Sequence, residues 1–312
     1  MGLNVIALGG NAILETDPTD KGQKAVVEQA AEAIAAFVEQ GEQVILCHGN
    51  GPQVGNLLLQ QQAGISEKNP PMSLDTCVAM TQGSIGYWLQ QALTNAFMQH
   101  GLNQPVVSIV TQVLVDPNDP SFQKPTKPIG PFYTEEEAKK SVQNNGGTYV
   151  EDAGRGYRKV VASPQPKEIV EKEALQALVA ANVVTICAGG GGIPVIESSG
   201  LYQGVEAVND KDFSAAVLAD AVGADRLIVL TGVEHIYINC GKPEEQALGT
   251  MTPEEAKEYV TAGHFAAGSM LPKVEAAVRF VASDPKRQAV ITSIGKLNHL
   301  TEGAGTVIQQ TR

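Results

Sequence analysis

The run Asn4-Val5-Ile6-Ala7-Leu8-Gly9-Gly10-Asn11-Ala12 decides the fold of this chain. A short apolar run that ends in turn residues is typical of a strand buried inside a parallel sheet. The two glycines leave backbone N–H groups uncovered, so an anionic ligand could approach them closely. A tight strand-to-helix turn without any ligand would fit the same letters. We therefore predict an α/β enzyme with a central first strand, and the ligand stays open at this point.

Composition excludes several classes of partner. With 312 residues the chain can bury a full core, and an apolar content of 43% is ordinary for a globular enzyme. The formal net charge of -12 argues against a nucleic-acid surface or an anionic membrane as partner. Positive charge that serves an anionic substrate must therefore be local, which directs attention to individual lysines.

Cysteine usage and the start of the chain indicate a compartment. The cysteines form no C-x-x-C pair, and Cys47 and Cys187 end apolar runs, which predicts small buried thiols. Met-Gly-Leu-Asn-Val enters the first strand with no basic segment and no apolar signal core. No apolar stretch approaches the ~20 residues of a membrane helix. We expect a cytoplasmic protein with reduced thiols.

Hydrophobic periodicity and turn residues predict strands that alternate with helices. The predicted strands are residues 4–8, 43–47, 106–115, 183–188, 226–231, 236–239, 288–291 and 306–308, with a hairpin through Gly200 and Gly204. The predicted helices are residues 21–40, 75–100, 168–181 and 210–222, with two more that begin near Pro253 and Gly268. This alternation predicts a mainly parallel open sheet covered by helices on both faces.

Residues 116–166 differ in composition from the rest of the chain, because they are rich in proline, glycine and charged residues. A structureless loop of even ~15 residues is uncommon in a compact domain. We therefore predict a small subdomain that protrudes from the sheet. Thr134 and Glu137 form a capping box that gives it a short helix.

Three glycine loops follow predicted strands, at residues 9–10, 49–55 and 189–192. Ligands of open α/β sheets gather outside the carboxyl ends of the strands, so three such loops favour a phosphate or carboxylate site.

The sequence motifs of several other enzyme classes are absent. The chain has no G-x-x-x-x-G-K-[ST], no G-x-S-x-G and no H-E-x-x-H, and after Gly49 and Gly51 the third glycine comes too late for G-x-G-x-x-G.

Lysines at helix starts are the candidate anion-binding groups. Asp210-Lys211-Asp212 opens a predicted helix, where the acids complement the helix dipole and Lys211 is either solvated or set on a phosphoryl group. Lys273 also lies at a helix start, where its charge opposes the dipole, so it needs an anion to meet. Covalent histidine chemistry is possible only at His48 or His264, and a loop residue bonded to backbone is the favoured interpretation of His48.

Together these motifs resemble the carbamate kinases, a group within the amino-acid kinase family. The resemblance runs in order along most of the chain. It is carried by Ala-Leu-Gly-Gly-Asn-Ala (7–12), His-Gly-Asn-Gly-Pro-Gln-Val-Gly (48–55), Met-Thr-Gln-Gly-Ser-Ile-Gly-Tyr (80–87), Pro-Thr-Lys-Pro-Ile-Gly-Pro (125–131), Glu-Asp-Ala-Gly-Arg-Gly (151–156), Gly-Gly-Gly-Gly-Ile-Pro-Val (189–195), Asp-Lys-Asp (210–212) and Gly-Ser-Met-Leu-Pro-Lys (268–273).

The resemblance implies a three-layer αβα sandwich with a mainly parallel eight-stranded sheet, usually in a homodimer. It implies an N-terminal lobe, residues 1–205, that binds carbamate or carbamoyl phosphate and carries the protruding subdomain 116–166. Residues 206–312 would form the nucleotide lobe. The implied reaction transfers phosphate between ATP and carbamate with Mg²⁺, held mainly by the nucleotide phosphates and not by a protein metal site.

Site residues follow from the resemblance, motif by motif. Lys127, Lys211 and Lys273 would contact the phosphates, and Asp212 would organise the lysines. Carbamate or carbamoyl phosphate would lie at Gly9, Gly10, Asn11, Gly49, Asn50 and Gly51. The residues expected near the nucleotide are Asp210, Lys211, Thr231, Tyr237, Lys242, Met270 and Lys273.

The mechanism expected from this resemblance is direct in-line transfer with no phosphoenzyme. Carbamate is already an anion, so its attacking oxygen carries no proton that a general base must remove. In cells such enzymes usually make ATP from carbamoyl phosphate during fermentative catabolism, in an arginine deiminase or related pathway.

Two alternatives remain open. Another amino-acid kinase would keep the fold and would be favoured by a lysine just before the first glycines, where this chain has Leu8. A non-catalytic small-molecule sensor would be expected to lose at least one lysine. Because the first loop carries no cation, we expect Lys127 of the protruding subdomain to complete the site when residues 116–166 close on it.

Overall fold

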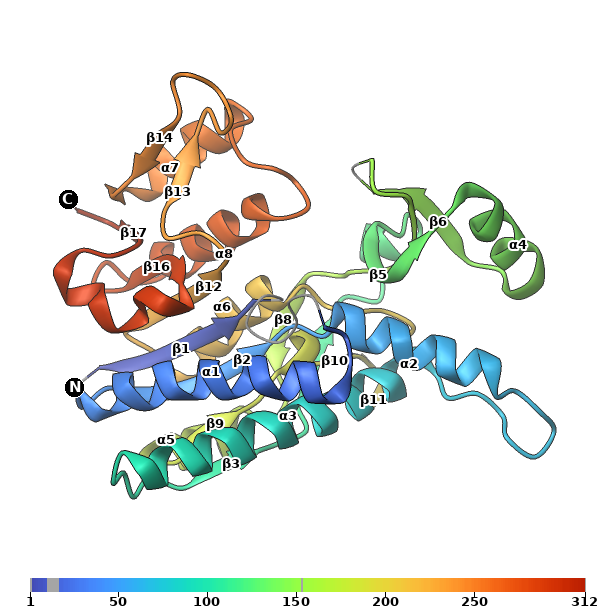
Figure 1. Cartoon of the computed structure of the whole chain (residues 1–312), viewed down its shortest axis with the longest axis horizontal. Helices are drawn as coiled ribbons and strands as arrows, with labels where there is room; N and C mark the ends of the chain where they lie inside the picture. The colour runs from blue at the N-terminus through green and yellow to red at the C-terminus, as the bar shows by residue number, and fades with distance from the viewer. Residues whose placement is uncertain (1, 10–16, 153, 312) are drawn as a thin grey trace.

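The body of the protein is a layered α/β structure from which a smaller unit projects (Figure 1). The computed structural model describes residues 2–9, 17–152 and 154–311. Its main sheet has eight strands in the order β15-β17-β16-β12-β1-β2-β9-β3, and only β16 and β17 pair antiparallel. In that order the strands span Thr250–Met251, Thr306–Gln309, Gln288–Ser293, Arg226–Thr231, Leu3–Leu8, Gln43–His48, Val184–Ile186 and Val106–Ser108.

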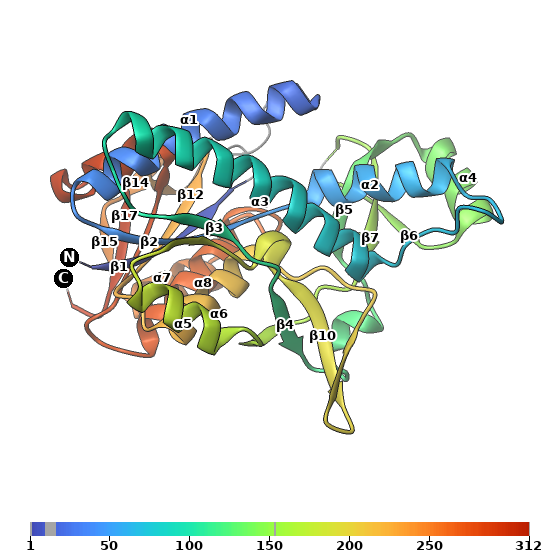
Figure 2. The same cartoon turned by 90° about the horizontal axis from the view of Figure 1, so that it is seen from below.

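Helices cover both faces of this sheet, as Figure 2 shows. On one face lie α1 and α3, and on the other lie α5, α6 and α8. The helices of the body are α1 (Asp20–Glu39), α2 (Gly51–Ala63), α3 (Leu74–Gln99), α5 (Lys172–Ala180), α6 (Lys211–Val222), α7 (Pro253–Thr261) and α8 (Met270–Ala282). The predicted three-layer αβα architecture with a mainly parallel eight-stranded sheet is confirmed.

Strand β1 is central, and its apolar run is explained by burial on both faces. Val5 and Ala7 pack into the core beneath α6 and α8, whereas Ile6 and Leu8 pack into the core beneath α1 and α3. Because side chains alternate across a strand, only a continuous apolar run fills both cores. Its carboxyl end then delivers Gly9 to the edge where the candidate site lies.

A three-stranded antiparallel sheet with one helix projects from the body in Figure 1, and its elements lie within residues 116–166, the segment predicted to protrude. It contains β5 (Lys127–Tyr133), β6 (Thr148–Glu151), β7 (Tyr157–Val161) and α4 (Glu135–Asn145). The capping box of Thr134 and Glu137 is formed as predicted, with both reciprocal hydrogen bonds present. Helix α2 packs against β5, so the subdomain is seated on the second glycine loop.

The remaining elements within the described ranges form two smaller sheets and three 3₁₀ helices. One sheet has the order β11-β10-β4-β8 and the other is the hairpin β13-β14. The strands are β4 (Gln112–Val115), β8 (Pro166–Ile169), β10 (Ile193–Ser198), β11 (Leu201–Gly204), β13 (Ile236–Ile238) and β14 (Gln246–Leu248). The 3₁₀ helices are η2 (Pro120–Phe122), η3 (Gly189–Gly191) and η4 (Ile294–Glu302).

The single strand predicted over residues 106–115 is wrong. The structure divides it into β3, which joins the main sheet, and β4, which joins the four-stranded sheet. The break occurs at Thr111, whose N–H donates to Gln82 Oε1 at 2.9 Å while its carbonyl accepts from Gln82 Nε2 at 3.0 Å. A buried side chain therefore satisfies backbone groups that a continuous strand would need for its ladder.

Two helix predictions also need correction. The helix predicted over 168–181 begins only at Lys172, because residues 166–169 pair with β4 as β8. Residues 51–55 were predicted as loop, yet they are the first turns of α2. Pro52 sits in the first turn of this helix, where its missing N–H costs nothing.

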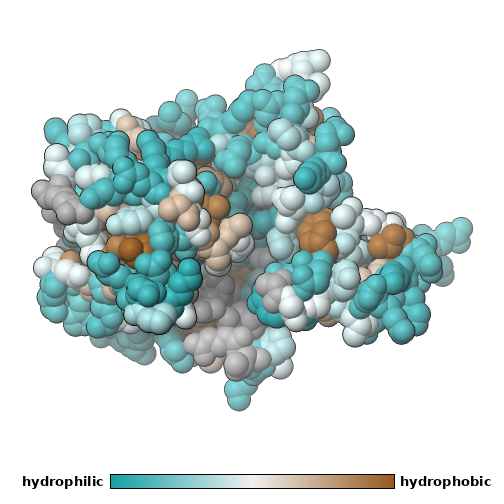
Figure 3. Space-filling model, turned by 90° about the horizontal axis from the view of Figure 1, so that it is seen from above, coloured by the Kyte–Doolittle hydropathy of each residue, from teal (hydrophilic) through white to brown (hydrophobic). Residues whose placement is uncertain are grey.

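None of the helices in the described ranges combines the length and apolarity needed to cross a membrane. The face seen in Figure 3 is mainly hydrophilic, with apolar side chains in small separate patches. Cys47 and Cys187 are buried free thiols, as predicted; Cys77 is also buried, and Cys240 is exposed.

Candidate active site

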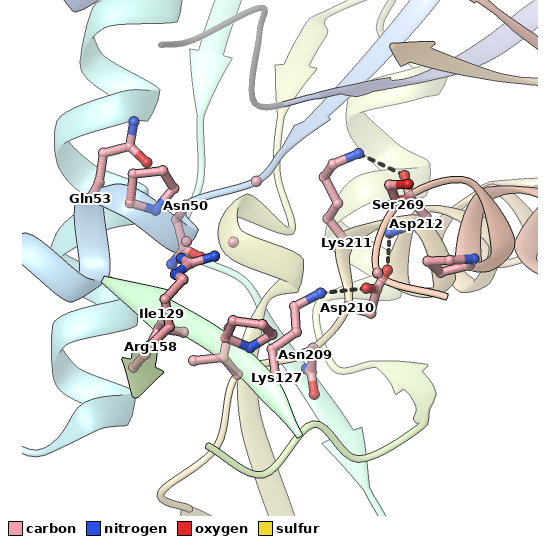
Figure 4. A pocket seen from close by; sticks show the side chains of 18 of the residues that line it. Asn50, Gln53, Lys127, Ile129, Arg158, Asn209, Asp210, Lys211, Asp212 and Ser269 are labelled. Carbon is pink, nitrogen blue, oxygen red and sulfur yellow. Dashed lines mark hydrogen bonds and ion pairs between the residues drawn. The ribbon is translucent and has the colours of Figure 1, made fainter. Parts of the chain in front are cut away.

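A cavity of about 310 Å³ lies where the second glycine loop, the protruding subdomain and the starts of α6 and α8 meet (Figure 4). Among the described residues that line it, four are cations and two are carboxylates, so the lining carries a formal charge of about two positive units in a strongly acidic chain. The charged lining residues are Lys127, Arg158, Asp210, Lys211, Asp212 and Lys273.

Three helices begin at this cavity. Its lining includes residues 51–53 of α2, residues 211–212 of α6 and residues 272–273 of α8. The starts of α2 and α8 have no side-chain cap, whereas Asp210 caps α6 by accepting from Asp212 N–H at 2.9 Å. Helix N-termini carry unpaired N–H groups and partial positive charge, and both favour anions. The cavity is therefore built for a negatively charged ligand.

Asp212 is the buried centre of the charge cluster. Its Oδ1 accepts from Lys211 Nζ at 2.6 Å and its Oδ2 accepts from Lys273 Nζ at 2.8 Å, while its side chain is only 3% exposed. Burial alone would raise the pKa of the Asp212 carboxyl, but the two ammonium groups outweigh burial and hold that pKa well below its usual range. Asp212 therefore stays ionised and keeps both lysines on one side of the cavity.

The two lysines respond differently to this setting. For Lys211, burial would lower the pKa, but Asp212 outweighs burial and the pKa lies above its ordinary value. For Lys273, burial and then the charge of Lys211 lower the pKa below its ordinary value, and Asp212 offsets only part of this. An arriving anion would relieve the repulsion between the two ammonium groups.

Lys127 links the protruding subdomain to the start of α6. Its Nζ donates to Asp210 Oδ2, while Oδ1 of the same carboxylate caps the helix. The subdomain thus brings a third lysine to the cavity, as Figure 4 shows.

Side chains that pack closely on the backbone explain two of the glycines around the cavity. A side chain at Gly49 would lie 3.1 Å from Cδ of Lys211, so this glycine leaves room for the lysine stem. A side chain at Gly190, which has φ +66°, would meet Asn50 Nδ2 at 2.2 Å. Asn50 is buried and donates to Thr81 Oγ1 at 2.8 Å, which fixes the second glycine loop against α3.

The comparisons with known proteins agree with this geometry. Residues 2–293 match the model of the amino acid kinase family. The chain is 69% identical over 310 residues to "Carbamate kinase 2" of Enterococcus faecalis, with 99% of each chain covered. The chain belongs to the carbamate kinases of the amino acid kinase family.

Solved structures give the same placement. The carbamate kinase of Giardia lamblia bound to citric acid superposes with a TM-score of 0.93 at 43% identity, covering 99% of each chain. The Giardia lamblia enzyme bound to AMP-PNP gives a TM-score of 0.90 at 44% identity, again with 99% of each chain covered. The resemblance inferred from the motifs is confirmed at the level of the family.

The structure brings together most of the residues predicted for phosphate and substrate. Gly9 lies at the end of β1, where an added side chain would meet the Leu230 carbonyl at 2.5 Å. The predictions for Gly10 and Asn11 lie outside the described residues. The predicted residues that line the cavity are Gly49, Asn50, Gly51, Lys127, Asp210, Lys211, Asp212 and Lys273.

Four predicted nucleotide residues do not line this cavity. Thr231 ends β12, Tyr237 lies in β13, Lys242 is exposed in the turn after β13, and Met270 packs at the start of α8 against the main core. Thr231 does lie beside Gly9, since its Cα is 3.9 Å from a side chain added there. Their nucleotide role stays a prediction.

Sequence reasoning missed several lining residues, of which Arg158 is the only cation. The missed set also contains Gln53, Gly190, Asn209 and Ser269. In the sequence, Arg158 was only one of the charges in residues 116–166, the segment rich in proline, glycine and charge. Its position beside the cavity follows from the pairing of β7 with β5, the strand that carries Lys127.

His48 is not among the residues that line the cavity. It is 1% exposed, and its Nδ1 lies 3.0 Å from the Gly49 carbonyl, which requires Nδ1 to carry the proton and donate. Burial lowers the pKa of His48 to about 4, so the ring is neutral near pH 7. The predicted bond of His48 to backbone is present, but His48 is the last residue of β2 and not a loop residue as predicted.

Proposed function

We propose that this protein transfers phosphate reversibly between ATP and carbamate, forming ADP and carbamoyl phosphate. The observation that carries the proposal is the cavity at which three helices begin and in which three lysines pair with two aspartates. Phosphoryl transfer needs little covalent help, and its main requirements are positioning and positive charge. The relatives named above include a carbamate kinase with bound AMP-PNP, which supports ATP as the nucleotide.

The proposed roles of the residues follow from their positions in the cavity. In our proposal, Lys211, Lys273 and Lys127 contact the phosphoryl oxygens, and Asp212 holds the first two lysines in place. The uncapped start of α2 and the loop Gly49-Asn50-Gly51 receive carbamate or carbamoyl phosphate. We assign the same ligand to Gly9, which follows β1 and does not line the described cavity, and to Gly10 and Asn11. No general base is required, because the carbamate oxygen is already ionised.

Mg²⁺ is expected to arrive with the nucleotide. The only carboxylates in the described cavity lining, Asp210 and Asp212, are both already paired with lysines. No group of three or more His, Cys, Asp or Glu side chains suited to a metal exists within the described ranges. These residues do not form a magnesium cage of their own, and Mg²⁺ is usually bound through substrate phosphates with few protein ligands.

We propose that residues 1–205 bind the carbamate side and residues 206–312 the nucleotide, with Asp210, Thr231, Tyr237, Lys242 and Met270 near it. We further propose a cytoplasmic homodimer that makes ATP from carbamoyl phosphate in fermentative catabolism, in an arginine deiminase or related pathway.

The deciding experiment supplies carbamoyl phosphate and Mg-ADP to the purified protein and measures ATP with a luciferase assay. We expect steady ATP formation by the wild type and a loss of orders of magnitude for Lys211→Ala with an unchanged circular dichroism spectrum. Absence of ATP with the folded wild type would contradict the proposed activity.

Direct transfer has a separate test. Protein incubated with γ-labelled ATP and then denatured should retain no radiolabelled phosphate. Label that stays on the denatured chain would overturn the direct mechanism and return attention to a covalent nucleophile such as His48.

A further inference from the structure

Arg158 is a cavity cation to which neither the motifs nor the proposed mechanism assigned a role. It lies in β7 of the protruding subdomain, its side chain is 16% exposed, and it lines the cavity with Lys127. We propose that Arg158 binds the carbamate end of the substrate. This inference rests on the proposed function.

The guanidinium is held in place before any ligand arrives. Its Nε donates to the Gly130 carbonyl at 3.1 Å, and its Nη1 lies 3.4 Å from Asp152 Oδ2. Its Cζ also lies 5.3 Å from the centre of the Phe132 ring, which adds a cation–π contact. These contacts use the N–H of Nε and one N–H of Nη1, and no described residue accepts a bond from Nη2. Because a guanidinium has five N–H groups, Nη1 and Nη2 can still present a pair of donors to two ligand oxygens.

The support beneath Arg158 is connected to the second glycine loop. Gly130, which accepts from Arg158, has φ +71° and packs directly on Gly55 of α2. Helix α2 begins at Gly51, in the loop that lines the same cavity. The guanidinium and the glycine loop are therefore positioned by one backbone contact, so they can act on the same ligand group.

The position of Arg158 favours the carbamate end over the phosphates. Lys127 and Lys211 point toward Asp210 and Asp212, whereas Arg158 stands across the cavity near Asn50 and Ile129 (Figure 4). Carbamate is a planar carboxylate, and the planar fork of arginine matches two coplanar oxygens in a way that a lysine ammonium cannot. Three lysines already serve the tetrahedral phosphoryl group, so the one guanidinium fits the planar group.

Arg155 provides a matched control within the same segment. It shares two partners with Arg158, since its Nη2 lies 3.2 Å from Asp152 Oδ1 and its Cζ lies 4.8 Å from the Phe132 ring centre. Its side chain is 62% exposed, however, and Arg155 does not line the cavity. Removing Arg155 therefore reports what the shared contacts contribute to the subdomain, without removing a cavity cation.

The experiment compares Arg158→Ala, Arg158→Lys and Arg155→Ala with the wild type in the ATP-forming direction. A hydrogen bond to a charged group is worth about a tenfold to hundredfold effect, so we expect Arg158→Ala to raise KM for carbamoyl phosphate by about tenfold or more. KM for ADP should stay within about twofold, because the nucleotide does not use this side chain. Arg158→Lys should recover only part of the loss, and Arg155→Ala should match the wild type.

Each outcome decides the question. An unchanged KM for carbamoyl phosphate in Arg158→Ala, or an equal rise in Arg155→Ala, would overturn the inference, as would a rise confined to KM for ADP. If Arg158→Ala fails to fold by circular dichroism, the folded Arg158→Lys variant decides by the same comparison. If the wild type makes no ATP, the proposed function itself is wrong. If the wild type makes ATP but the Arg158 variants keep its KM for carbamoyl phosphate, only this inference is wrong.

Discussion

Lys273 Nζ lies 2.8 Å from Oδ2 of Asp212, although the two residues are 61 positions apart and each sits in the first turn of its helix. An ammonium group at a helix N-terminus opposes the dipole, so this lysine needs a compensating anion. Asp212 supplies it and at the same time binds Lys211 through its other oxygen at 2.6 Å. The carboxylate therefore allows two like charges to stay together where a phosphate is expected.

Asp212→Asn should separate this pair of lysines. We expect kcat to fall by about hundredfold or more, because the neutral amide no longer holds both ammonium groups in the geometry of transfer. Unfolding free energy should fall by about 3–5 kcal/mol, as for other broken buried ion pairs. Asp220→Asn, on the same helix but paired with Arg287 at the surface, should cost under about 1 kcal/mol and leave kcat unchanged. A kcat for Asp212→Asn within tenfold of the wild type would contradict the role given to this carboxylate.

Lys127→Ala should show that the protruding subdomain supplies part of the catalytic charge. We expect kcat/KM to fall by about a hundredfold, because the cavity loses one of the cations proposed to contact the phosphoryl oxygens. Lys167→Ala is the control, since Lys167 makes a similar pair with Asp116 at 2.6 Å in an exposed position away from the cavity. Equal rates for the two variants in the coupled ATP assay would disprove the role of Lys127.

The histidines predict how stability depends on pH. The folded pKa of His48 is about 4 and its ordinary value is 6.5, so the unfolded chain takes up this proton first as pH falls. Stability should therefore decline from pH 6.5 toward pH 4, by up to ~3 kcal/mol from this group. Urea unfolding of His48→Gln at several pH values should give a flatter profile than the wild type, and identical slopes would contradict the prediction.

His100 should act in the opposite direction and serves as the control for that measurement. Its hydrogen bonds to Glu39 and then Glu32 raise its pKa, so its contribution is fully present below pH 6.5 and is lost as pH rises through the folded value. His100→Gln should therefore lose stability relative to the wild type at low pH only. The same decline toward pH 4 should persist in this variant, because His48 is unchanged.

Sequence reasoning found the layers of the fold because they depend on local patterns. The apolar run of β1, the 3.6-residue period of α1 and the capping box at Thr134 each signal one element without reference to distant residues. The helix start at Asp210-Lys211-Asp212 was also readable, and with it the main charge cluster.

The misses were positions decided by long-range contacts. Residues 51–55 looked like loop because Gly51, Pro52 and Gly55 disfavour helix, yet Gly55 is required by a backbone neighbour far along the chain. The break at Thr111 depends on Gln82, and the place of Arg158 depends on strand pairing in the subdomain. Local propensity carries no information about such partners, and tertiary contacts override it.

Gly55→Ala should expose the coupling between the subdomain and the second glycine loop. A Cβ at this position would lie 1.9 Å from Cα of Gly130, so α2 and β5 must move apart. We expect a loss of about 1–3 kcal/mol in unfolding free energy, and a fall of about a hundredfold in kcat/KM because Lys127 and Arg158 shift with β5. Gly83→Ala is the matched control, since Gly83 lies within α3 with no atom within 4 Å of an added Cβ. That variant should be neutral or gain about 0.5–1 kcal/mol, as alanine favours helix. Thermal unfolding and the coupled ATP assay measure both effects, and a Gly55→Ala variant that behaves like Gly83→Ala would show that the contact can relax without disturbing the site.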